Sequence, residues 1–178
     1  MRSLRFLVGS ISLLVVAGLD AQAQCTAAGA PANCSQAGSV SMTAGRVVRL
    51  QMSAGSTSLT APTTADFDAG FNSTTGPTLT VSANAAWTLH IRAASAVWTA
   101  TNTTTGVVAR VNKPAADLKW STASNGTFTA LSASDANLVS GPATASSATT
   151  LYFQTLYDWA LDTPGNYSMS VVLTLTSP

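Results

Sequence analysis

The sequence predicts an all-β fold, an antiparallel β-sandwich of about seven to nine short strands in a single domain. The first observation is hydrophobic alternation with period two, which directs successive side chains to opposite faces of a sheet. The second is a series of turn signals between the alternating segments. The third is composition: Ser and Thr fill 48 of 178 positions and the seven acidic residues are all aspartate, whereas helical proteins use glutamate heavily.

The clearest alternation lies at residues 87–93 and 167–175. The apolar residues of the first segment occupy every second position, at Trp87, Leu89, Ile91 and Ala93. The C-terminal segment repeats the pattern with Tyr167, Met169, Val171, Leu173 and Leu175. This register predicts that Leu89 and Leu173 face the core, while Thr88 and Thr174 face solvent.

The other strands are predicted from shorter patterns. They are residues 46–52 with Val48, Leu50 and Met52 inward, and residues 78–82, 96–100, 107–111, 118–120 and 149–157. The turn signals are Gly55-Ser56, Gly76-Pro77, Asn125-Gly126, Gly141-Pro142 and Pro164-Gly165. Residues 53–75 and 132–148 are polar and rich in small side chains, which predicts loops or edge pieces.

The N-terminal segment has the features of a secretory signal peptide. Arg2 and Arg5 precede an apolar run over residues 6–19, and Ala21-Gln22-Ala23 supplies an A-x-A cleavage site. The run is shorter than the roughly 20 residues that a membrane-spanning helix needs. The expected organisation is a signal peptide at residues 1–23, an N-terminal flap at 24–39 and the sandwich at 40–178.

Two cysteines, Cys25 and Cys34, enclose a short segment of small residues in the predicted flap. In an oxidising compartment they are expected to form a disulfide with each other. A redox or metal site is the alternative, but the Cys-x8-Cys spacing matches no common site and the chain has one His.

The predicted mature chain has no net charge. Removing Arg2, Arg5 and Asp20 with the signal peptide leaves six basic and six acidic residues. This balance excludes a basic nucleic-acid-binding face. Only Lys113 and Lys119 remain as the lysines that usually block pairing at sheet edges, so self-association or a surface partner is expected. The short segment 96–100 is the first choice for the exposed edge.

The segment from Asp162 to Tyr167, together with the last alternating strand, resembles the end of bacterial immunoglobulin-like and pilin-like secreted domains. It is also similar to spore coat protein U-like domains, which end in a Gly-x-Tyr strand of alternating Thr and Val. The resemblance covers the C-terminal strand only, and the early cysteines do not fit the framework of that family. It implies an immunoglobulin-like sandwich in which Tyr167 packs at one end, as a tyrosine corner does.

Chaperone-usher pilins, a further comparison, differ from this chain in two respects. Residues 24–39 lack the alternating apolar side chains that a donated strand needs. The last strand reads as complete, which predicts a fold that needs no strand from another molecule.

The residues with catalytic chemistry are few. His90 lies on the polar face of its strand with no nucleophile or metal-ligand motif nearby, which is typical of a surface residue. Asp66 and Asp68 allow glycosidase chemistry or weak calcium binding, but in a Thr- and Gly-rich loop such residues usually form turns. No catalytic residue, metal ligand or cofactor-binding residue is therefore predicted.

Tryptophans provide the only candidates for ligand binding. Trp87 and Trp120 share faces with core residues, whereas Trp98 and Trp159 are candidate platforms for stacking a sugar. Structural packing is the competing interpretation, because the sequence shows no acidic or amide group beside either ring.

The leading hypothesis is an exported, non-catalytic β-sandwich that serves as a structural or adhesive subunit of a cell-surface, filament or matrix assembly. The alternative is a secreted module that binds carbohydrate or another ligand. The protein is expected in the periplasm, at the cell surface or outside the cell, with no cofactor, no nucleic-acid partner and no transmembrane segment.

Overall fold

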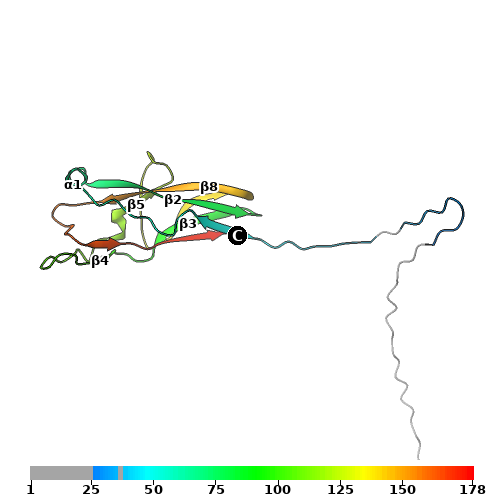
Figure 1. Cartoon of the computed structure of the whole chain (residues 1–178), viewed down its shortest axis with the longest axis horizontal. Coiled ribbons are helices and arrows are strands. Elements are labelled where there is room, and N and C mark those ends of the chain that lie inside the picture. Colours follow the sequence, from blue (N-terminus) through cyan, green and yellow to red (C-terminus); the bar gives the residue numbers. More distant parts are fainter. Residues whose placement is uncertain (1–25, 36–37) are drawn as a thin grey trace, which may run out of the picture. The chain divides into compact units, whose positions relative to one another are not determined.

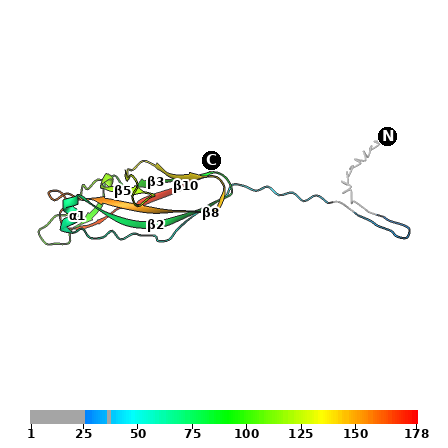
Figure 2. The ribbon, with the colours of Figure 1, turned by 90° about the horizontal axis from the view of Figure 1, so that it is seen from above.

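The computed structural model describes residues 26–35 and 38–178. Residues 44–178 form a β-sandwich whose two layers are visible from the side and from above (Figures 1 and 2). Its elements are β1 (Val48–Met52), α1 (Thr64–Ala69), β2 (Phe71–Ala83), β3 (Trp87–Ala93), β4 (Thr99–Thr101), η1 (Ala115–Asp117), β5 (Leu118–Ser121), β6 (Thr129–Ala130), β7 (Ala136–Gly141), β8 (Thr144–Leu156), β9 (Asn166–Ser168) and β10 (Val171–Thr176).

All the strand pairs are antiparallel. One layer is a five-stranded sheet in the order β1-β2-β8-β5-β6. The other layer has the order β10-β3-β7, and the short ladder β4-β9 accompanies it. The predicted all-β antiparallel sandwich is confirmed, with ten strands in the described part of the chain where seven to nine were expected.

Strand β3 occupies the centre of its sheet, and its predicted register is confirmed. Leu89, Ile91 and Ala93 have no exposed surface, and they pack on the inner residues of the opposite sheet, among them Leu79, Leu151 and Phe153. Leu89 lies opposite Leu175 of β10 and Val139 of β7. Leu175 and Val139 are partly buried and pack against the core, so the fully buried residues of β3 form its centre.

Two segments that were predicted as loops or edge pieces contain regular structure. Residues 64–69 form α1 and residues 71–75 begin β2, while residues 132–148 contain β7, an edge strand as the prediction allows, and the start of β8. The helix and the starts of β2 and β8 were missed because these Ser- and Thr-rich residues show little hydrophobic alternation. Their pairing with a neighbouring strand decides their conformation.

The Gly76-Pro77 pair was predicted to form a turn between strands, but it lies inside β2. The β2–β8 register shifts between Thr75 and Thr78, so the pair sits at a bulge, where a proline is tolerated. A Cβ on Gly76 would lie 2.6 Å from the Phe153 ring. The glycine therefore permits close packing of β2 on β8.

Two further strand predictions need correction. Residues 107–111 form no strand, and the side chains of Val108 and Val111 are exposed. The C-terminal alternation is split into β9 and β10, with a break at Met169 and Ser170. In β1, Leu50 packs on the core as predicted, but Val48 and Met52 are exposed because β1 is an edge strand.

The N-terminal region is described only in part. Residues 26–35 and 38–43 form no helix or strand, and the compact unit that contains the sandwich begins at Ala44. The predicted signal peptide and Cys25 lie outside the described residues. The Cys25–Cys34 disulfide therefore stays a prediction.

Candidate functional site

The sandwich has an open edge at β10. This strand hydrogen-bonds to β3 on one side and has no partner strand on the other among the described residues. Strand β1 forms the corresponding edge of the facing sheet. An unpaired edge strand presents a row of backbone N–H and C=O groups that are ready to bond another strand.

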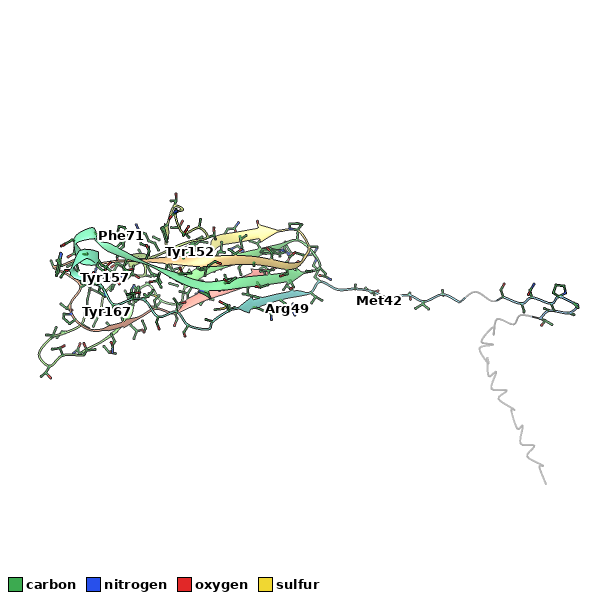
Figure 3. The ribbon with its side chains drawn as sticks, turned by 45° about the horizontal axis from the view of Figure 1, so that its top comes forward. Met42, Arg49, Phe71, Tyr152, Tyr157 and Tyr167 are labelled. Atoms are coloured by element: carbon green, nitrogen blue, oxygen red, sulfur yellow. The ribbon has the colours of Figure 1, made fainter. Side chains whose placement is uncertain are left out.

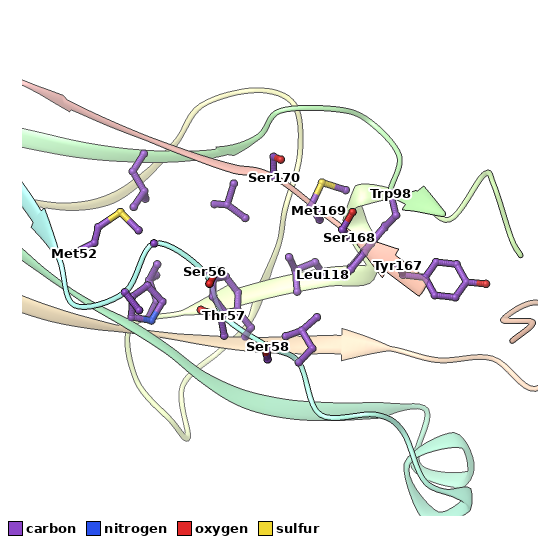
Figure 4. A pocket seen from close by; sticks show the side chains of 18 residues that line it. Met52, Ser56, Thr57, Ser58, Trp98, Leu118, Tyr167, Ser168, Met169 and Ser170 are labelled. Carbon is purple, nitrogen blue, oxygen red and sulfur yellow. The ribbon is translucent and has the colours of Figure 1, made fainter. Parts of the chain in front are cut away.

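A groove of about 620 Å³ lies beside this edge (Figure 4). One wall is residues 167–171 together with Leu173, and the other is Met52 with residues 54–59. Its apolar lining includes Trp98, Leu118, Leu151 and Phe153. No charged residue lines it. These four side chains are each at most 6% exposed, so the groove reaches the core between the two sheets without exposing it.

Tyr167 closes one end of this groove, and its hydroxyl fixes a turn. The hydroxyl donates to the backbone oxygen of Thr163 at 2.6 Å and accepts from the backbone N–H of Arg110 at 2.9 Å. A bond from a tyrosine hydroxyl to the backbone a few residues upstream is the geometry of a tyrosine corner. Tyr167 lies toward the end of the sandwich that also carries Tyr157 (Figure 3).

The position of the open edge differs from one sequence-based expectation. The exposed edge was expected at residues 96–100, but Trp98 N–H donates to Lys113 O and Ala115 N–H donates to Ala96 O, each at 2.8 Å. Segment 113–115 therefore covers that edge.

A buried cluster of charged side chains, which sequence reasoning missed, lies near Tyr157. Lys113 Nζ lies 3.0 Å from both carboxylate oxygens of Asp162, 3.2 Å from Asp117 Oδ2 and 2.8 Å from the backbone oxygen of Leu156. Arg110 Nη1 bridges the same two carboxylates, at 3.0 Å from Asp162 and 3.3 Å from Asp117. The side chains of Lys113 and Asp162 are only 3% and 6% exposed.

This charged cluster has a structural role. Two positive and two negative charges balance, and every donor position of the Lys113 ammonium finds an oxygen. Buried charges are tolerated when they are paired and hydrogen-bonded in this way. The cluster joins the loop that ends at Lys113 to the loop after β8.

The two candidate tryptophan platforms have different environments. Trp98 is 3% exposed and its Nε1 donates to Pro114 O at 3.1 Å. It presents no ring face to solvent, so its assignment as a platform is corrected. Trp159 is 61% exposed and stacks on Phe67 with ring centroids 4.6 Å apart. Its Nε1 donates to Asp68 Oδ1 at 3.1 Å, so an acidic group does lie beside this ring.

The remaining chemistry-bearing residues have local partners. Asp66 forms a capping box with Thr63 at the start of α1. Hydrogen bonds from the backbone N–H and hydroxyl of Thr63 lower the pKa of the Asp66 carboxyl. Asp66 and Asp68 lie on α1, where Asp68 contacts Trp159. His90 is half-buried, in contrast to the predicted surface position, and its Nδ1 has no hydrogen-bond partner.

The described residues contain no group of three or more His, Cys, Asp or Glu residues arranged to hold a metal ion. In the same part of the chain, no helix combines the length and the apolar character needed to cross a membrane. Neither a family model nor a curated protein matches this chain.

Proposed function

We propose that this protein is an exported, non-catalytic structural or adhesive subunit that associates with other subunits through the edge of its sandwich. The observation that carries this proposal is the unpaired edge of β10 beside an apolar groove. A strand from a partner would bond to β10 and place alternate side chains in the groove, as in β-strand addition. The signal-peptide pattern at residues 1–23 supports export.

The strand order supports an incomplete immunoglobulin-like sandwich. In that fold the strand that carries the tyrosine corner lies between two neighbours in its sheet. Here Tyr167 lies in β9, which pairs with β4, and β10 follows it in the chain with β3 as its one partner strand among the described residues. On this interpretation the strand that would close the groove must come from elsewhere.

The chemistry of the edge also supports association. Natural sheet edges are commonly blocked by charged side chains, above all lysine, or by proline. Strand β10 has the sequence VVLTLT, and the groove lining has no charge. No charged side chain of β10 or of the groove lining opposes an incoming uncharged strand.

A lysine in the groove tests the proposal. Leu173→Lys is expected to abolish self-association of the exported protein, because an incoming strand would have to bury the ammonium group. Thr174→Lys is the matched control, since it adds the same charge to the other face of β10 and should leave association intact. His90→Ala should also leave it intact. Sedimentation velocity measures the association state, and circular dichroism shows whether each variant is folded.

Ser170→Lys provides a second variant if Leu173→Lys does not fold, because Ser170 is an exposed residue of the groove lining. Equal association of all the folded variants would contradict the proposal.

Carbohydrate binding is the second candidate function, and the Trp159–Asp68 contact favours it. The outer face of the Trp159 ring is available for stacking, and Asp68 is positioned to accept a hydrogen bond from a sugar hydroxyl. A protein that stays monomeric at high concentration, and whose Trp159 fluorescence shifts on addition of an oligosaccharide, would favour this function over assembly.

A further inference from the structure

We infer that Lys113 and Asp162 form an intramolecular isopeptide bond, an amide that joins Lys113 Nζ to Asp162 Cγ with the loss of one water molecule. The buried ion pair described above is the state before this reaction. The inference concerns a covalent modification of the chain by its own side chains, and it does not depend on how the subunit associates.

The two groups that would react are already in contact and shielded from water. Lys113 Nζ lies 3.0 Å from both carboxylate oxygens of Asp162, and both side chains are almost fully buried. The Tyr157 ring covers one side, with its centroid 5.6 Å from Nζ. Reactants held this close behave as if each were present at about 10⁵ M or more. Exclusion of water from the site disfavours the competing hydrolysis of the amide.

Asp117 is placed to transfer the proton that the reaction moves. Its Oδ2 lies 3.2 Å from Lys113 Nζ. Both cations of the cluster contact Oδ2 of Asp117 and Oδ1 of Asp162, so Oδ1 is the Asp162 oxygen on the Asp117 side. The other oxygen, Oδ2, accepts a hydrogen bond from the backbone N–H of Asp158 at 2.9 Å. A carboxylate beside both the attacking nitrogen and the leaving oxygen can act as base and then as acid.

The reaction balances without any further reactant. A proton first passes from the Lys113 ammonium to Oδ1 of Asp162, which leaves a neutral amine beside a carboxylic acid. The amine nitrogen attacks Cγ and forms the C–N bond, while the Asp158 N–H stabilises the negative charge on Oδ2. Asp117 accepts a proton from the attacking nitrogen and returns it to Oδ1. The C–Oδ1 bond then breaks, and Oδ1 leaves as water.

Electrostatics favour the product over the ion pair. The cluster holds two positive and two negative side chains in a largely buried site. Amide formation removes one charge of each sign, and Arg110 and Asp117 remain paired at 3.3 Å. Fewer charges then have to be kept away from water. The new amide N–H retains the Leu156 backbone oxygen as its acceptor, 2.8 Å from Nζ, and the amide oxygen retains the Asp158 N–H.

The bond would close a large loop of the sandwich. Lys113 and Asp162 are 49 positions apart, and β5, β6, β7 and β8 lie between them. A force applied through the two chain ends would pass through the bond and would not unfold these strands, which suits a structural or adhesive subunit. In the bonded protein, replacement of Lys113 would cost more stability than the loss of the ion pair alone.

The intact mass of the full exported chain tests the inference. After reduction of any disulfide, the mass is expected to be lower than the sequence mass by one water molecule. Proteolysis should release a branched peptide that joins Lys113 to Asp162. A folded protein with its full sequence mass would overturn the inference.

Two exchanges of lysine for arginine provide a matched comparison. Lys113→Arg keeps the positive charge, but a guanidinium does not lose its proton to become a nucleophile. This variant should therefore show no loss of water. Lys119→Arg makes the same exchange on β5, outside the cluster, and should show the full loss. Circular dichroism shows whether each variant is folded. A loss of water that persists in Lys113→Arg, or a branched peptide between other residues, would overturn the assignment.

Asp117→Asn separates proton transfer from folding, because asparagine has a similar shape and accepts no proton. Bond formation in newly made protein, followed by mass over time, should be at least about a hundredfold slower in this variant than in the unmodified chain. Equal rates would overturn the role assigned to Asp117. These measurements detect no association between molecules, so this inference and the proposed function stand or fall separately.

Discussion

Leu89→Ala is expected to lower the free energy of unfolding by about 2 to 5 kcal/mol. Leu89 has no exposed surface and lies at the centre of β3, between Leu175 and Val139. The substitution removes buried methyl groups and leaves a cavity that neighbours on both strands cannot fill without moving the sheet. Urea unfolding of the dissociated protein, followed by tryptophan fluorescence, measures the loss.

Thr88→Ala is the control for this prediction, because Thr88 lies one residue away on the outer face of the same strand. It should cost less than about 1 kcal/mol. Leu173→Ala should cost less than Leu89→Ala in the dissociated protein, since Leu173 is only half-buried and lines the groove. Equal losses at residues 88 and 89 would show that the register of β3 is misassigned.

Lys113→Met is expected to lower the free energy of unfolding by about 3 to 5 kcal/mol. The methionine fills a similar volume but leaves Asp117 and Asp162 with Arg110 as the remaining cation of the cluster. An excess negative charge then stays buried, and the backbone oxygen of Leu156 loses a donor. The loss is thus larger than that of an exposed ion pair, which contributes at most about 1 kcal/mol.

Lys119→Met is the matched control, because it removes the same charge and side chain from β5 at a half-buried position. It should change the free energy of unfolding by about 0.5 kcal/mol or less. Chemical denaturation at neutral pH compares the two variants. A loss at Lys113 no greater than that at Lys119 would mean that the cluster does not stabilise the fold.

The fold was predictable where the signal is local. In β3, every second residue is apolar and the strand is buried on one face, so the sequence pattern and the structure coincide. The first seven residues of β2 and the first five of β8 were missed because their Ser and Thr residues do not alternate with large apolar ones. These stretches are strands because β2 and β8 pair with each other in an antiparallel ladder.

Much of the candidate site depends on contacts between distant segments. Lys113 and Asp162 are separated by 49 positions, and no local motif links them. The partner of Trp159, Asp68, is 91 positions away. The open edge follows from the order of the strands in the sheet. The alternation of apolar and polar residues in β10 does not show that this strand lacks a neighbour on one side. Sequence alternation reports which face of a strand is buried, and it does not report which strand lies beside it.

Hydrogen exchange in the associated and dissociated forms of the full exported chain tests the assembly edge most directly. Pairing with a new strand should slow exchange of outward-pointing amides of β10 by at least about tenfold. The amides of β6, at the far edge of the other sheet, should exchange equally in both forms. Unchanged exchange throughout β10, or slowing confined to β6, would contradict association through this edge.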